Sequence, residues 1–272
     1  TAAEAALAAY AAAPNAANID RHESENVLSF WQAVAPHTGR RPLAGRTLVA
    51  TGSHGLVLEF SADGRTEWRQ PIRAWSAEPL TGGGTLLAVF EEQRIVELNR
   101  TGEIVWEFSG IAATRAKPLP DGRILATDFS AARIVEIDRQ KNVAWSLATP
   151  EGAFDVERTA HGHTFYGCAN LIREVTPDGR VVGQWPVSGR LNGLQVLADG
   201  RMLIANFGGN EVALLNRDGS VAWRLAESQP SDAFQSSDGR LLVTTAKRCA
   251  EFDDKREFVR EWTPARYGTA RR

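Results

Sequence analysis

The sequence has little of what several common classes of protein depend on. Its 272 residues include two cysteines, Cys168 and Cys249, which excludes a disulfide-stapled scaffold. No apolar run approaches the ~18 residues that a membrane-spanning helix requires, so no membrane span is expected. The net charge of −2 gives no electrostatic case for a nucleic acid as partner. The remaining composition, 43% hydrophobic and 24% charged, is that of an ordinary globular protein.

What the sequence does have is a long repeat marked by tryptophan. Tryptophans recur at intervals of 38 to 40 residues: Trp68, Trp106, Trp145, Trp185, Trp223 and Trp262. A period in this range is typical of propellers and repeat arrays. Because a repeat cannot bury its faces without its neighbours, the regular spacing favours one closed domain. The tryptophans occupy equivalent places, which predicts that they pack between neighbouring repeats.

Each repeat carries the signals of two tight turns. In the clearest copy the first turn is Asp121-Gly122 and the second, weaker one is Lys141-Asn142. Glycine takes a positive φ without steric cost, so Asp-Gly between apolar runs predicts a hairpin. Two hairpins and one preceding strand predict a four-stranded antiparallel unit. Six such units predict an all-β fold, a six-bladed β-propeller.

The preceding strand of each unit becomes the innermost strand of its blade. These strands are expected within residues 72–80, 111–119, 153–159, 191–197 and 232–236, with a poor first copy near 37–43. The two cysteines fall in different blades and at different depths. They are therefore expected to be two buried thiols that form no bond with each other.

The residues before the repeats are expected to form a short N-terminal helical extension. The chain begins with an alanine-rich run, and alanine is the best helix former. A second helix is predicted over residues 21–34, packed on the side or end of the propeller. A lid over the central channel, or an extra outer strand over residues 27–34, are the alternatives. This divides the chain into an extension, residues 1–35, and the propeller, residues 36–272.

The most regular phrases of the repeat point to a known type of propeller. They are Pro-Asp-Gly-Arg-Ile-Leu-Ala at residues 120–126 and Arg-Ile-Val-Glu-Ile-Asp at residues 133–138. This repeat resembles bacterial propellers of the NHL and pyrroloquinoline-quinone-like (PQQ-like) type, and is similar to the repeats of arylsulfotransferase-type propellers. The resemblance covers about residues 42–262 and implies architecture alone. Quinone-dependent dehydrogenases of this type have eight blades and vicinal cysteines, whereas this sequence predicts six blades and has no vicinal cysteines. An arylsulfotransferase would have a catalytic histidine in the channel, and His37 is the one histidine here that could fall on an innermost strand. No catalytic residue is therefore carried over.

The two ends of the predicted ring differ in their loops. The Asp-Gly turns fall on one end, and the longer connections fall on the other, which we call the mouth. Varied loops on a rigid scaffold are where binding sites usually lie. Exposed aromatic side chains beside arginines are typical of binding hot spots. The predicted binding surface consists of Arg73, Trp75, Arg115, Phe129, Arg190, Asn192 and Phe207.

Carboxylates on the innermost strands carry the alternative hypothesis, an enzyme. Its acid–base groups at the mouth of the channel would be Asp155, Glu157, Asp232 and Glu78, oriented by Arg115 and Arg190. A carboxylate whose pKa is raised by burial can act as general acid or base, which suits a hydrolase, lyase or cyclase. The competing interpretation is that these acids and the nearby bases neutralise one another in a narrow channel.

Metal and cofactor chemistry has weak support in the sequence. His161 and His163 replace an Asp-Gly-Arg turn of the repeat, so they fall at the end opposite the mouth, without further ligands at metal spacing. We expect no cofactor. Calcium held by channel carboxylates, as in some six-bladed lactonases, is the one alternative, although their full ligand set is not recognisable.

Asp128 and Asn206 share a repeat position after the second strand, where a short side chain can hydrogen-bond the backbone of the next turn. They are therefore predicted to be structural caps.

The favoured function is therefore a binding propeller that presents a small ligand, a glycan or a protein partner at its mouth. The alternative is the enzyme described above. The chain starts at Thr1 without a methionine, which is consistent with a removed leader. This slightly favours a periplasmic or secreted protein.

Overall fold

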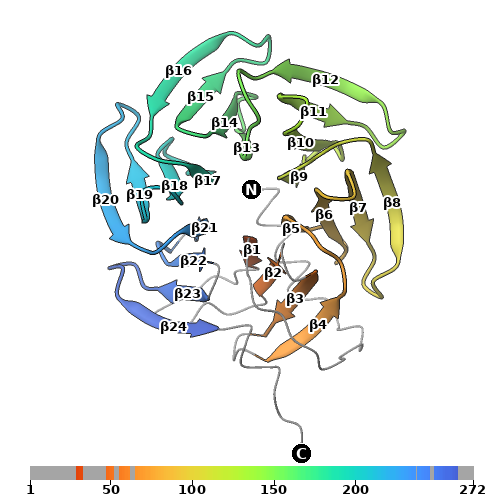
Figure 1. The fold of residues 1–272 in the computed structure, drawn as a ribbon, viewed down its shortest axis with the longest axis horizontal. Coiled ribbons are helices and arrows are strands. Elements are labelled where there is room, and N and C mark those ends of the chain that lie inside the picture. Colours follow the sequence, from red (N-terminus) through yellow and green to blue (C-terminus); the bar gives the residue numbers. More distant parts are fainter. Residues whose placement is uncertain are drawn as a thin grey trace, which may run out of the picture.

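The computed structural model describes residues 29–32, 47–51, 55–61, 65–236, 238–245 and 248–262. These residues form 24 strands in six four-stranded antiparallel sheets, and they contain no helix. The sheets are arranged around a centre as the blades of a ring (Figure 1). The predicted all-β, six-bladed propeller is confirmed.

Each blade consists of four consecutive strands, numbered outward from the centre of the ring. Blades one and two contain β1 (Ser29–Gln32), β2 (Thr47–Thr51), β3 (Leu56–Phe60), β4 (Thr66–Gln70), β5 (Ser76–Pro79), β6 (Thr85–Val89), β7 (Arg94–Leu98) and β8 (Ile104–Ser109). Blades three and four contain β9 (Ala116–Pro118), β10 (Ile124–Asp128), β11 (Arg133–Ile137), β12 (Val143–Ala148), β13 (Asp155–Arg158), β14 (Thr164–Cys168), β15 (Leu171–Val175) and β16 (Val181–Pro186). Blades five and six contain β17 (Leu191–Val196), β18 (Met202–Asn206), β19 (Glu211–Leu215), β20 (Val221–Ala226), β21 (Pro230–Gln235), β22 (Leu241–Thr245), β23 (Cys249–Phe252) and β24 (Phe258–Trp262).

The weak second turns adopt the backbone of the strong ones. Gly102 and Gly219 take φ values of 86° and 85° in their Asp-Gly-type turns. Lys141 and Arg256, at the corresponding positions, both take a φ of 67°. A positive φ is uncommon for residues with a side chain. The pairing of the flanking strands therefore imposes the turn even where glycine is missing.

The hydrophobic core lies between the blades. One cluster joins Leu86 and Ile95 of blade two to Ile124 and Val135 of blade three, all at most 1% exposed. Sheets covered on both faces carry apolar residues on both, which explains the continuous apolar runs of the inner strands. A further cluster joins blade six to blade one and closes the ring. Among the described strands, each of these two blades consists of four consecutive strands of the chain.

The tryptophans form the outer part of these seams, as predicted. Three indole N–H groups donate to a carbonyl of the next blade: Trp106 to Arg139 (3.2 Å), Trp145 to Pro177 (3.2 Å) and Trp185 to Arg217 (2.9 Å). Trp68 and Trp223 pack into the apolar clusters that join their blades to the next. The side chain of Trp262 lies outside the described residues.

Buried glutamates add a polar contact to three of these seams. Each pairs with an arginine of the following blade: Glu97 with Arg139, Glu136 with Arg158 and Glu174 with Arg217. The same arginines stack over the seam tryptophans, with guanidinium-to-centroid distances between 4.9 and 5.9 Å. Buried charges require such pairing, because desolvation otherwise outweighs what they gain.

The start of the propeller differs from the sequence prediction. Residues 29–32, predicted as part of a helix over 21–34, form strand β1, in which Phe30 pairs with Val49 of β2. The helix is therefore wrong at these residues, and β1, not a strand near 37–43, is innermost in blade one. Phenylalanine and tryptophan in this stretch favour a strand, and pairing with β2 overrides the helical spacing.

This result also moves the start of the propeller ahead of residue 36. The extra outer strand considered for residues 27–34 is a strand in part, but it lies at the inner edge of its sheet. Residues 1–28 and 33–46, including the expected alanine-rich helix and the strand near 37–43, lie outside the described residues.

Two expectations from composition can be compared with the fold. Cys168 in blade four and Cys249 in blade six are buried and free, as predicted. Within the described ranges, no helix is long and apolar enough to cross a bilayer.

Candidate functional site

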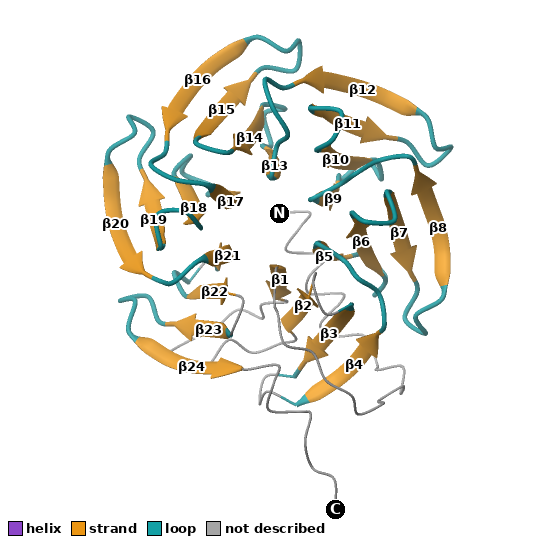
Figure 2. Ribbon diagram, in the orientation of Figure 1, coloured by secondary structure: helices purple, strands orange, loops and turns teal. Residues whose placement is uncertain are grey.

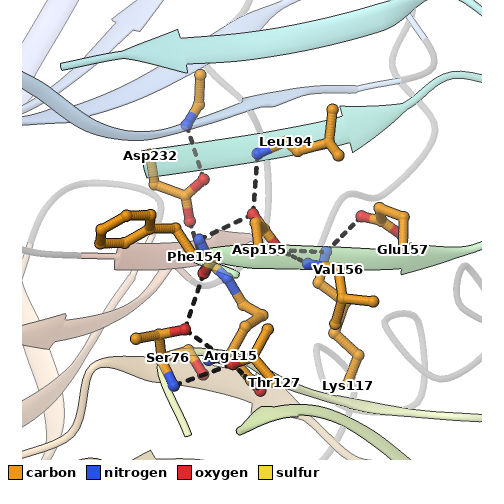
Figure 3. Close-up of polar contacts among 12 residues, drawn as sticks. Ser76, Arg115, Lys117, Thr127, Phe154, Asp155, Val156, Glu157, Leu194 and Asp232 are labelled. Carbon is orange, nitrogen blue, oxygen red and sulfur yellow. Dashed lines mark hydrogen bonds and ion pairs between the residues drawn. The ribbon is translucent and has the colours of Figure 1, made fainter. Parts of the chain in front are cut away.

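The innermost strands β5, β9, β13, β17 and β21 face the centre of the ring (Figure 2). Arg115 directly precedes β9 of blade three, Asp155 begins β13 of blade four, and Asp232 lies in β21 of blade six. Arg115 Nη1 donates to Asp232 Oδ2 at 2.8 Å, and its Nη2 lies 3.0 Å from Asp155 Oδ2 (Figure 3). Blades three and six lie opposite each other in the ring (Figure 1). The hydrogen bond between Arg115 and Asp232 therefore joins opposite blades across the centre.

Asp155 is held by more than this ion pair. Its Oδ1 accepts a hydrogen bond from the backbone N–H of Val156 at 2.7 Å, and its Oδ2 accepts one from Leu194 N–H at 2.8 Å (Figure 3). Lys117 Nζ lies 3.5 Å from Oδ1. The side chain is 1% exposed. A carboxylate that accepts this many charged and backbone donors is fixed in position.

Glycine in blade five makes room for the cluster. Gly193 occupies the place in β17 that Asp155 and Asp232 occupy in their own blades. A Cβ atom at Gly193 would lie 2.5 Å from Asp232 Oδ1 and 3.1 Å from the Cα of Asp232. The missing side chain therefore leaves the space that the Asp232 carboxylate fills.

A second layer lies two residues further along the same strands, away from the mouth. Lys117 of β9 pairs with Glu157 of β13 (Figure 3). Gln195 of β17 bridges to blade six, because its Nε2 donates to Gln235 O at 3.0 Å and its Oε1 accepts from Gln235 N at 2.7 Å. Among the described residues, no hydrogen bond or ion pair reaches the carboxyl group of Glu78 in β5.

Desolvation sets the protonation of these groups. Burial raises the pKa of Glu78 to about 8, although Lys117 and Arg115 act against that rise. Burial also raises the pKa of Glu157 and of Asp232. For Lys117, burial lowers the pKa, but the carboxylates of Asp155 and Glu157 outweigh that effect and raise it overall. The two cations of the channel are therefore charged at neutral pH, whereas Glu78 is largely neutral.

Aromatic side chains follow one another along the mouth loops from blade two to blade five. We call them the aromatic arc: Trp75, Phe90, Phe129, Phe154 and Phe207. Successive ring centroids from Trp75 to Phe154 are 4.9, 6.1 and 5.0 Å apart. Arg190 continues the arc, since its guanidinium carbon lies 5.7 Å from the Phe154 centroid and 4.1 Å from the Phe207 centroid. The rings are half-buried, while Arg190 is exposed.

The structure separates the predicted site residues into two groups. The channel brings together Arg115, Asp155, Glu157 and Asp232, with Glu78 in the second layer. The mouth brings together Trp75, Phe129, Arg190 and Phe207. Arg115, expected on the binding surface, is only 5% exposed and belongs to the channel.

Arg190 had a second predicted role, and Arg73 and Asn192 belong to neither of the two groups. Arg190, expected to orient carboxylates, contacts aromatic rings instead. Arg73 is exposed beside Trp75, and Asn192 of β17 is half-buried. Within the described ranges, no hydrogen bond reaches the buried Oδ1 of Asn192.

Phe90 and Phe154 of the arc, and Gly193 of the channel, were not among the residues predicted from the sequence. Phe90 follows β6 as Phe129 follows β10, and Phe154 precedes β13 as Trp75 precedes β5. Aligning the repeats position by position would have found both rings. The role of Gly193 depends on a neighbouring blade, and no local signal indicates it.

Asp128 and Asn206 were predicted as structural caps, and His161 and His163 were considered as metal ligands with weak support. Asn206 caps its loop, since its Oδ1 accepts Gly209 N–H at 2.9 Å and its Nδ2 donates to Ser188 O at 2.9 Å. Asp128 pairs with Arg133 at 2.9 Å across its own hairpin. His163 Nδ1 lies 2.7 Å from Glu174 Oε1. In the part of the chain that the structure describes, no three His, Cys, Asp or Glu side chains are grouped to hold a metal ion.

Comparison with known families agrees with this architecture. The sequence model of the PQQ-like repeat family described as outer membrane protein assembly factor BamB matches residues 19–161. The chain belongs to this BamB family. The PQQ-like resemblance inferred from the repeat is thereby confirmed. A comparison with curated proteins found no match.

Solved structures with the same fold come from proteins of low sequence identity. A protein of unknown function from Bacteroides caccae shares 17% identity, with a TM-score of 0.68 over 79% of this chain and 92% of that chain. Virginiamycin B lyase from Staphylococcus aureus shares 13%, with a TM-score of 0.63 over 88% and 84%. A streptogramin B lyase shares 11%, with a TM-score of 0.62 over 90% and 89%. At these identities the likeness establishes the fold alone.

Proposed function

We propose that this member of the BamB family is a binding propeller that holds a partner on its mouth. The observation that carries the proposal is the aromatic arc with Arg190 at its end. Aromatic rings and arginine are the side chains that most often dominate binding energy at interfaces. The arc gathers them on loops of four blades at one end of a rigid ring, where they remain accessible.

The channel supports a structural role better than a catalytic one. Asp155 and Asp232 both pair with Arg115, and Glu157 pairs with Lys117. A buried carboxylate that is fully paired cannot exchange a proton without losing those contacts. The acids and bases therefore neutralise one another, and the cluster holds three blades in fixed positions beneath the mouth.

The family supports one class of partner over the others. A small ligand, a glycan and a protein are all compatible with the sequence, but an assembly factor works on other proteins, which favours a protein partner. The periplasmic or secreted location stays a prediction.

Site-specific photo-crosslinking tests this proposal. A photoreactive amino acid replaces Ser130, exposed beside Phe129 on the mouth, and in a matched variant Gln140, exposed at the opposite end of the same blade. In the cells that encode the protein, we expect crosslinks to a partner from position 130 and not from position 140. Phe207→Ser should weaken them. Equal crosslinking from both ends, or a partner unaffected by Phe207→Ser, would contradict the proposal.

An enzyme is the second candidate, and Glu78 is the observation that favours it. Burial raises the pKa of this carboxyl to about 8, close to the value that suits a general acid or base at neutral pH. Once the crosslinked partner is known, mass spectrometry of that partner after incubation with the protein decides the question. A chemical change that Glu78→Gln abolishes while binding persists would establish the enzyme.

A further inference from the structure

The aromatic arc carries opposite charges at its two ends. Glu91 lies at the Trp75 end, where its Oε1 accepts the indole N–H of Trp75 at 3.0 Å. Arg190 lies at the Phe207 end, stacked on that ring. Both side chains are exposed on mouth loops. The charged side chains that contact the terminal rings therefore differ in sign, with Glu91 on Trp75 in blade two and Arg190 on Phe207 in blade five. This difference gives the arc a direction.

Neither charge is neutralised by a neighbour that the structure describes. Among the described residues, no cation lies within ion-pair distance of Glu91, and no carboxylate lies within that distance of Arg190. Three other carboxylates of the mouth are paired, at distances of 2.5 to 2.9 Å: Glu92 with Arg94, Asp128 with Arg133 and Glu227 with Arg248. Stacking on Phe207 holds the guanidinium of Arg190 in place without occupying its N–H donors, so they are free to bind a carboxylate.

The shape of the arc favours an extended ligand. Its rings succeed one another along the loops of four blades, so a compact ligand would meet only two or three of them. Ring centroids follow at 4.9 to 6.1 Å. Side chains on one face of an extended peptide recur at about 6.6 Å, a spacing close to that of the rings.

We propose that the arc binds an extended peptide segment of a protein partner. The segment has apolar or aromatic side chains in its middle, a basic group at the Glu91 end and an acidic group at the Arg190 end. This inference rests on the proposed function and adds the chemistry of the partner to it. Charge complementarity of this kind fixes the orientation of a ligand more than it adds affinity.

Synthetic peptides of about nine residues with blocked ends, long enough to run along the arc, test the proposal by fluorescence anisotropy. They carry a fluorescein label and phenylalanine at alternate positions, with serine between. One has lysine at one end and glutamate at the other, one has lysine at both ends, and one has glutamate at both. A fourth keeps the mixed ends but replaces phenylalanine by serine. Low salt keeps exposed charges from being screened.

The mixed-end peptide should bind the native protein about fivefold more tightly than either same-end peptide, and the serine peptide should bind more weakly still. Arg190→Glu makes both ends of the arc acidic, so the peptide with two lysines becomes the preferred one. Glu91→Lys makes both ends basic, so the peptide with two glutamates is preferred. The double variant, which carries both Glu91→Lys and Arg190→Glu, again has ends of opposite charge and should again prefer the mixed-end peptide.

Two variants serve as matched controls, with thermal unfolding showing that each is folded. Arg256 also stacks on an aromatic ring, Trp223, but at the end opposite the mouth. Glu151 is an exposed mouth carboxylate on the connection between β12 and β13. Arg256→Glu and Glu151→Lys should leave the native order of preference unchanged.

The outcomes separate this inference from the proposed function. If the aromatic peptides bind equally well whatever their end charges, the charges do not orient the ligand and this inference is wrong. The proposal that the mouth binds a partner would still stand. Control variants that shift the preference as much as Arg190→Glu would overturn the assignment of the ends. If no peptide binds, the proposal of a peptide ligand is wrong. Whether the mouth binds a partner at all is tested separately by the crosslinks from position 130.

Discussion

Two arginines of this propeller show how burial decides what a charged side chain does. Arg115 is 5% exposed and pairs with Asp155 and Asp232. Arg190 is exposed at the mouth, stacks on Phe207 and has no acidic partner within the described ranges. A buried charge must be paired to be tolerated, whereas an exposed one is solvated and remains available. The first arginine is therefore held within the scaffold, whereas the second is available for the recognition that we propose.

The largest effect should come from breaking the channel cluster. Arg115→Met leaves the buried carboxylates of Asp155 and Asp232 without their shared cation. We expect a loss of roughly 3–5 kcal/mol in the free energy of unfolding, measured by denaturant titration. Adding Asp155→Asn and Asp232→Asn to Arg115→Met should recover part of that loss. A change below about 1 kcal/mol would show that the cluster does not hold the blades.

A smaller effect should come from filling the space beside that cluster. Gly193→Ala places a Cβ atom 2.5 Å from Asp232 Oδ1, so the carboxylate or the strand must shift. The expected cost is about 1–3 kcal/mol in the free energy of unfolding. In an Asp232→Ser background the same change should cost less, because the clashing oxygen is removed. An equal cost in both backgrounds would mean that the strain lies in the β17 backbone instead.

These contacts mark the limit of sequence analysis. The blades, their turns and the role of the tryptophans follow from signals repeated every 38 to 40 residues, where each copy supports the others. Strand β1 has no Asp-Gly turn after it, so the helical spacing of residues 27–34 had no competing signal. Arg115 and Asp232 are 117 residues apart in sequence, and their pairing depends on how six blades close around a centre. The candidate residues of the channel were predictable, but their partners were not.

Glu78 also tests the rule that a buried charge requires a partner. It is a desolvated carboxyl for which the structure describes no hydrogen bond or ion pair. Burial raises its pKa to about 8, from an ordinary value of 4.5. Between these values the folded protein keeps a proton that the unfolded chain has released, so stability falls as the pH rises from about 4.5 to about 8. Glu78→Gln should remove a slope of up to about 1 kcal/mol per pH unit, measured by denaturant unfolding at several pH values. Parallel profiles for the two proteins would show that Glu78 does not titrate in this range.

The smallest effect on stability should come from the exposed arginine. Arg190→Ala removes a stacked but unpaired side chain, so the free energy of unfolding should change by less than about 0.5 kcal/mol. The matched variant is Arg217→Ala, because Arg217 also stacks on an aromatic ring, Trp185, but pairs with the buried Glu174 at 2.6 Å. That variant should lose about 1 kcal/mol or more, since it takes a partner from a buried acid. Comparable losses in the two would place Arg190 in the scaffold with Arg115, and would remove the reason to regard it as a recognition residue.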